Sequence, residues 1–167
     1  NSRMKLFDSV VSATMLYGNA TWTLTKALEQ EIRTTQRRML RMVLGSGRKI
    51  VDADTGDIES WVDWLRRTTR ETERRLQSLR MTEWLTRHRQ NKLEWAKKLV
   101  TTDRHTWASR ALLWTHDRWK CQRAQARPRR RWLDVITDLV KQVGSNLLWD
   151  QALQDPATFA KMIAHVS

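Results

Sequence analysis

The sequence is poor in cysteine, glycine and proline, with 1, 5 and 2 of these residues in 167. Few glycines and prolines leave few positions for the tight turns that join β-strands. The single cysteine, Cys121, excludes an intramolecular disulfide framework and a thiolate-rich zinc knuckle. No apolar run approaches the roughly 20 residues needed to cross a bilayer. We therefore expect an all-α chain with no membrane partner.

Apolar residues recur at helical spacing along most of the chain. The best-marked helix covers residues 25–44, with acidic residues in its first turns, basic residues in its later turns and Gly45 at its end. Asp57 is the expected N-cap of the next helix, and Asp155 that of the last. The expected helices cover residues 2–16, 25–44, 57–81, 82–100, 105–114, 130–143, 146–153 and 156–166.

The spacing of apolar residues also predicts which side chains are buried. In the helix over residues 25–44 the expected buried stripe is Leu28, Ile32, Thr35, Met39 and Val43. The chain has 10 tryptophans, and several fall on or beside such stripes. Those expected in the core include Trp61, Trp64, Trp84, Trp95, Trp132 and Trp149.

Positive charge dominates the composition. Lys and Arg total 31 against 18 Asp and Glu, giving a formal net charge of +13. Residues 33–49 hold six basic and no acidic side chains, residues 66–92 nine against three, and residues 118–131 seven against none. Arginine outnumbers lysine, which suits bidentate contacts to phosphate. The charge pattern predicts a polyanion lying across several helices.

The first and third basic blocks, residues 33–49 and 118–131, supply the candidate RNA-binding residues. Trp114 and Trp119 flank the start of the third block, where core patterning is weak, and aromatic rings among arginines can stack on exposed bases. The alternative is a basic linker that is only solvated. The candidate RNA-binding residues are Arg33, Arg37, Arg38, Arg41, Arg48, Lys49, Arg118, Trp119, Lys120, Arg123, Arg127, Arg129, Arg130 and Arg131.

Catalytic and metal-binding patterns are weak by comparison. The neighbourhood of His105, His116 and Cys121 matches no usual zinc spacing. Asp134 and Asp138 share a helical face, but basic residues within reach favour a solvated ion-pair face over a metal site. No glycine-rich phosphate loop is present. We expect no catalytic residue, no metal and no cofactor.

Several short runs, taken in order, resemble one family. They are the run Leu-Tyr-Gly-Asn-Ala-Thr-Trp at 16–22, Thr-Gln-Arg-Arg-Met-Leu-Arg at 35–41, Leu-Glu-Trp-Ala at 93–96, and Arg-Pro-Arg-Arg-Arg-Trp-Leu-Asp at 127–134. Gly144 and Trp149 follow near their usual places. Together they are similar to the thumb and C-terminal region of reverse transcriptases from non-LTR (LINE-type) retrotransposons.

The chain also departs from that family. Ala20 and Thr21 stand where a glutamate commonly precedes the tryptophan, Lys97 and Lys98 replace a Gly-His pair, and Val135 replaces an acidic residue. The catalytic Tyr/Phe-x-Asp-Asp motif of the palm is absent from the 167 residues. The resemblance therefore implies a part that grips RNA and does not copy it. It implies thumb-like helices in residues 1–50. The residue pattern predicts long helices with Trp-rich faces in 51–114, a basic linker in 115–129 and a helical segment in 130–167.

The resemblance leaves two histories open. In the first, the chain is a fragment of an active reverse transcriptase whose palm lies upstream of Asn1, which would place it in the nucleus or cytoplasm. In the second, which the missing motif favours, a thumb remnant serves as a non-catalytic RNA-binding subunit of a large ribonucleoprotein, such as a mitochondrial or other organellar ribosome. The expected partners are rRNA or template RNA, with other protein subunits. A third alternative is a Trp-rich module that docks onto proteins.

Overall fold

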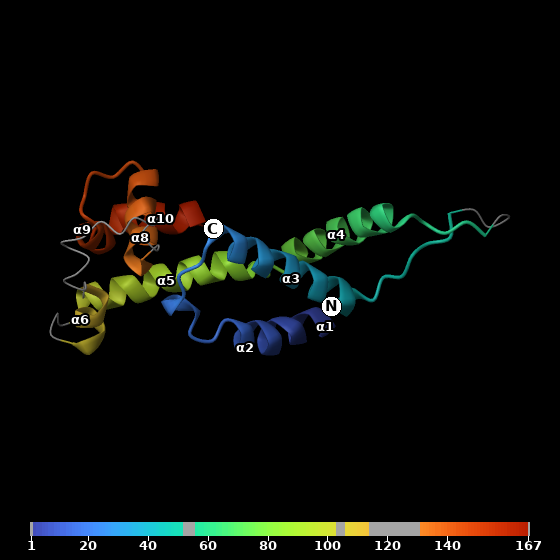
Figure 1. Cartoon of the computed structure of the whole chain (residues 1–167), viewed down its shortest axis with the longest axis horizontal. Coiled ribbons are helices and arrows are strands. Elements are labelled where there is room, and N and C mark those ends of the chain that lie inside the picture. Colours follow the sequence, from blue (N-terminus) through green and yellow to red (C-terminus); the bar gives the residue numbers. More distant parts are fainter. Residues whose placement is uncertain (1, 52–55, 103–105, 114–130, 167) are drawn as a thin grey trace, which may run out of the picture. The chain divides into compact units, whose positions relative to one another are not determined.

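A computed structural model describes residues 2–51, 56–102, 106–113 and 131–166 of the chain (Figure 1). Every regular element in these residues is a helix, which confirms the all-α prediction. An isolated antiparallel bridge joins Ile50 and Ile58. No helix within these ranges is long and apolar enough to cross a bilayer. The chain forms two compact units, Asn1–Tyr17 with Lys26–Leu85 and Gly18–Thr25 with Thr86–Ser167.

The first unit is a set of packed helices. Its elements are α1 (Ser2–Leu6), the π-helical η1 (Phe7–Ser12), α2 (Ala13–Met15), α3 (Lys26–Leu44), α4 (Trp61–Ser78) and the first residues of α5 (Trp84–Thr101). Helix α3 contacts both α1 and α4. Between α3 and α4 two non-helical segments, residues 46–51 and 56–60, extend away from the helices (Figure 1). We call them the two extended arms. The helices predicted over residues 2–16 and 25–44 are thus confirmed.

Trp84 lies at the centre of the first unit and is fully buried, as predicted. Its indole Nε1 donates to the hydroxyl of Ser12 at 2.7 Å, and its backbone N–H donates to Gln36 Oε1 at 3.0 Å. The ring stacks on Phe7 with the centroids 5.7 Å apart. The remaining core side chains are Met4, Leu16, Leu40 and Leu76.

The buried face of α3 matches the predicted stripe in part, because Ile32 and Val43 pack against the core of the first unit. Leu28 and Met39 are exposed, so their predicted burial is wrong, and Gln36 and Leu40 are buried instead. The reason is tertiary, because the buried Gln36 side chain accepts a hydrogen bond from the backbone N–H of Trp84, 48 residues further along the chain. A prediction based on hydropathy alone passes over a buried glutamine.

Helix α4 begins later than predicted. Its N-cap is Ser60, whose hydroxyl accepts from the backbone N–H of Asp63 at 3.1 Å, so the prediction of Asp57 is wrong. Asp57 instead belongs to an extended arm, where its carbonyl accepts from the N–H of Val51 at 2.7 Å. At the other end, Arg80 has a positive φ of 52° between α4 and α5. The two helices are therefore separate, as predicted.

The second unit comprises the short η2 (Asn19–Thr21), the rest of α5, α6 (Trp107–Leu113), α8 (Trp132–Gln142), α9 (Trp149–Gln154) and α10 (Pro156–Val166). The carboxylate of Asp155 accepts from the N–H of Thr158 at 2.9 Å, which confirms the predicted N-cap of α10. Trp132 and Trp149 pack against the core of this unit. That core consists of Leu93, Ala96, Ile136, Leu139, Val140, Ala152, Leu153, Met162 and Val166.

Candidate functional site

The basic side chains of α3 fall into two groups. Arg37 is held by acidic residues, because its guanidinium lies 3.0 Å from Glu73 and 3.8 Å from Glu83. Arg33 and Arg38 are exposed and form no ion pair within the described residues. Arg41 donates to the hydroxyl of Thr69 on α4 at 3.3 Å. Arg37 and Arg41 therefore contact α4, whereas Arg33 and Arg38 present their charge to solvent.

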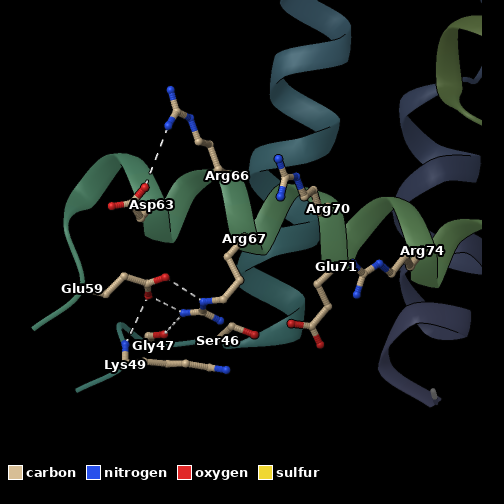
Figure 2. A pocket seen from close by; sticks show the side chains of 10 residues that line it. All are labelled: Ser46, Gly47, Lys49, Glu59, Asp63, Arg66, Arg67, Arg70, Glu71 and Arg74. Carbon is tan, nitrogen blue, oxygen red and sulfur yellow. Dashed lines mark hydrogen bonds and ion pairs between the residues drawn. The ribbon is translucent and has the colours of Figure 1, made fainter. Parts of the chain in front are cut away.

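A groove of about 870 Å³ lies along α4 (Figure 2). We call it the arginine groove. In Figure 2, Arg66 and Arg70 extend to one side of α4, and Lys49 with Gly47 lies on the other. The lining residues are Ser46, Gly47, Lys49, Glu59, Asp63, Arg66, Arg67, Arg70, Glu71 and Arg74.

Arg67 holds the two extended arms together at the base of the arginine groove. Its guanidinium donates to both carboxylate oxygens of Glu59, at 2.9 and 2.7 Å, and to the carbonyl of Gly47 at 2.9 Å. The backbone N–H of Lys49 also donates to Glu59 at 3.3 Å. Hydrogen bonding from Arg67 lowers the pKa of Glu59 to about 2. The guanidinium of Arg67 is therefore ion-paired within the protein, unlike that of an arginine that is open to a ligand.

Three other arginines of α4 keep their charge available. Arg66, Arg70 and Arg74 follow one another at intervals of four residues, which places them on one face of the helix. Arg66 lies 3.9 Å from Asp63, but both side chains are more than 60% exposed, so the pair is weak. Arg70 and Arg74 have no hydrogen bond or ion pair in the part of the chain that the structure describes. These side chains can take an anionic ligand without breaking a strong contact.

A second groove of about 590 Å³, here the tryptophan groove, lies at the start of α4. Trp61 and Trp64 stack there with ring centroids 4.7 Å apart, and the Arg48 guanidinium lies 5.5 Å from the Trp61 centroid. The indole N–H of Trp64 donates to the carbonyl of Ser46 at 2.9 Å. The lining residues are Arg38, Arg41, Met42, Gly45, Ser46, Gly47, Trp61 and Trp64.

The prediction that Trp61 lies in the core is wrong, because its side chain is 56% exposed. It is the first residue of α4, and the contacts of its ring with Trp64 and Arg48 leave much of the indole uncovered. Among the described tryptophans, only Trp107 is more exposed.

Arg41, in the wall of the tryptophan groove, is partly buried. Partial burial lowers the pKa of Arg41, and the charges of Arg37 and Arg38 lower it further. Burial is the larger cause, so the shift reports the partial desolvation of the Arg41 guanidinium.

The structure brings together part of the predicted RNA-binding set. Arg38 and Arg41 line the tryptophan groove, Arg48 covers Trp61, and Lys49 lines the arginine groove. Arg33 lines neither groove. Arg37 is ion-paired, and Arg131 belongs to the second unit, where its backbone N–H donates to Asp134 at 2.7 Å. The candidates that lie outside the described residues are Arg118, Trp119, Lys120, Arg123, Arg127, Arg129 and Arg130, and Trp114 lies outside them too.

The predicted RNA-binding residues do not include the arginines of α4, although the sequence carries a signal for them. The block at residues 66–92 is basic, and the four-residue spacing of Arg66, Arg70 and Arg74 predicts a single stripe. The interleaved acidic residues obscured it. Only the structure shows that Glu73 pairs with Arg37 and Glu71 with Arg75, which leaves the stripe positive.

No group of His, Cys, Asp and Glu side chains suited to a metal ion occurs within the described ranges. No family model, curated protein or solved structure matches this chain. The similarity to reverse transcriptase thumbs therefore stays a prediction. The candidate site rests on the two grooves of the first unit.

Proposed function

We propose that this chain is a non-catalytic RNA-binding protein that holds RNA in the arginine and tryptophan grooves. The observation that carries the proposal is the stripe of Arg66, Arg70 and Arg74 in a groove that shares Ser46 and Gly47 with the groove of the exposed Trp61. In this proposal the chain derives from a reverse transcriptase thumb and serves as a subunit of a large ribonucleoprotein, such as an organellar ribosome.

The spacing of the stripe suits a polyanion. A helix rises about 1.5 Å per residue, so side chains four residues apart are separated by about 6 Å along the axis. Successive phosphates of one strand can therefore engage successive arginines, and each contact releases condensed counterions. The tryptophan groove adds a surface for bases, which have aromatic faces. Phosphate and base contacts together favour a nucleic acid over a small anion.

The alternative of a Trp-rich docking module has less support. Of the tryptophans that the structure describes, only Trp61 and Trp107 are exposed, and they lie in different units. A docking face made of several indoles is therefore not present in these ranges. The other alternative, a fragment of an active reverse transcriptase, predicts an Asp-Asp palm motif upstream of Asn1. Sequencing the transcript tests that alternative directly.

The test of RNA binding is a salt titration of the affinity for single-stranded RNA with the full chain. We expect log K to fall linearly as log salt rises between about 50 and about 200 mM. The triple variant Arg66→Gln, Arg70→Gln, Arg74→Gln should flatten the slope by up to about 2, since each lost phosphate contact on a single strand contributes about 0.7.

The matched control removes the same charge elsewhere in the first unit. Lys5, Lys26 and Arg80 are exposed and line neither groove, so their triple replacement by glutamine should leave the slope nearly unchanged. An affinity that does not depend on salt contradicts RNA binding by charge. Equal losses in the two triple variants would show that net charge, and not the arginine groove, attracts the RNA.

A further inference from the structure

We infer that Trp61 is a stacking platform for an unpaired RNA base, so that the first unit selects single-stranded over double-stranded RNA. This inference rests on the proposed function and adds the class of RNA that is bound. Three features of the tryptophan groove support it: Trp64 holds the ring of Trp61, arginines surround that ring, and the groove adjoins the arginine groove.

The platform is held in place before any ligand binds. Trp64 stacks on Trp61 at 4.7 Å, and Trp64 is itself anchored by the hydrogen bond from its indole to Ser46. An exposed aromatic ring that is already positioned loses little conformational freedom on binding. Bases of any sequence stack on such a ring, because every base has an aromatic face.

The charges around the ring suit a nucleotide better than an uncharged partner. The Arg48 guanidinium lies 5.5 Å from the Trp61 centroid, so a base that stacks on the ring takes its place and moves this arginine to the edge of the indole. Arg38 and Arg41 line the same groove. No acidic side chain lines this groove within the described residues. A base on the indole would bring its phosphate next to these guanidinium groups, which is the pairing that a basic aromatic surface favours.

The two grooves adjoin each other. Ser46 and Gly47 line both of them, so a strand that stacks a base on Trp61 can continue into the arginine groove toward Lys49. In a duplex the base faces are covered by their neighbours, and only unpaired bases offer a face to an aromatic side chain. Duplex RNA could therefore use the arginines but not Trp61.

The experiment compares a labelled oligouridine of about 12 nucleotides with a blunt RNA duplex of about the same length, a size within the usual single-strand site. We expect Trp61→Ala to weaken oligouridine binding about 5- to 100-fold and to change duplex binding less than about twofold. Trp61→Phe should retain most of the affinity because the ring is kept.

Trp107 provides the matched control. It is 82% exposed and also lies beneath an arginine, with Arg110 5.6 Å from its centroid. Trp107→Ala should leave both affinities unchanged. Equal losses in the two alanine variants, or a Trp61→Ala loss that is the same for single strand and duplex, would overturn the stacking assignment.

The outcomes separate this inference from the proposed function. If Trp61→Ala changes neither affinity while the triple arginine variant weakens both, the protein binds RNA and the stacking inference is wrong. If the wild-type chain binds neither RNA, the proposed function fails and the inference with it. Selective binding of an acidic peptide in place of either RNA would also overturn both.

A fluorescence measurement covers the case in which Trp61→Ala does not fold. Oligouridine should quench the wild-type emission more than that of Trp61→Phe, because the difference reports the indole of Trp61 itself. Equal quenching in the two folded proteins would overturn the inference.

Discussion

The Nζ of Lys92 lies 2.8 Å from the carbonyl oxygen of Trp22, to which it donates a hydrogen bond. The ammonium also lies 4.9 Å from the ring centroid of Trp132, and the residue is only 2% exposed. A buried charge is costly unless it is paired. The carbonyl and the indole face offset that cost and tie residues 18–25 to α5 and α8 within the second unit.

Replacing Lys92 with methionine should lower the free energy of unfolding by about 1–3 kcal/mol, because the shape is retained but the carbonyl of Trp22 loses its donor. Urea unfolding followed by circular dichroism measures the change. Lys98→Met, an exposed position on the same helix, is the control and should shift stability by less than about 0.5 kcal/mol. Equal effects at the two positions would contradict a specific role for Lys92.

Trp84→Ala should destabilise the first unit by about 3–5 kcal/mol, because the indole is fully buried and its loss leaves both a cavity and an unpaired Ser12 hydroxyl. Thermal unfolding checks this. Trp107→Ala, which removes an exposed indole, should change stability by less than about 0.5 kcal/mol. A small effect of Trp84→Ala would mean that the first unit tolerates this cavity.

The Ser60 N-cap gives a prediction that distinguishes the observed start of α4 from the one expected from sequence. Ser60→Ala should cost about 1 kcal/mol, because the N–H of Asp63 loses its acceptor. Asp57→Ala should have almost no effect on helix stability, since α4 begins beyond it. The reverse order of effects in urea unfolding would restore Asp57 as the cap.

The contact of Glu59 with Arg67 makes the arms sensitive to acid. The folded-state pKa of Glu59 is lowered from an ordinary value near 4.5 to about 2. Its contribution to stability is therefore complete above about pH 4.5 and is lost as the pH falls from there to about 2. A carboxyl carbon NMR titration measures this pKa directly. In Glu59→Gln this part of the acid sensitivity should be missing, and an unshifted titration near pH 4.5 in the wild type would contradict the ion pair.

The sequence by itself determined the helices and several of their ends. The stretch 25–44 is a helix that stops at Gly45, and Asp155 caps α10, because propensity, capping and left-handed glycine act within a few residues. The sequence also placed Arg38, Arg41, Arg48 and Lys49 in one basic block, and the structure brings them to the two grooves of the candidate site, because charge runs are visible without the fold.

The tertiary structure alone decided which side chains are buried and which charges stay available. Trp84 and Trp61 are alike in hydropathy, yet one is covered by Phe7 and the other is left exposed at the start of α4. Arg37 is ion-paired with Glu73, 36 positions further along the chain, whereas Arg70 has no ion pair within the described residues. Burial and ion pairing join residues that are distant in sequence, so periodicity along one helix cannot specify them.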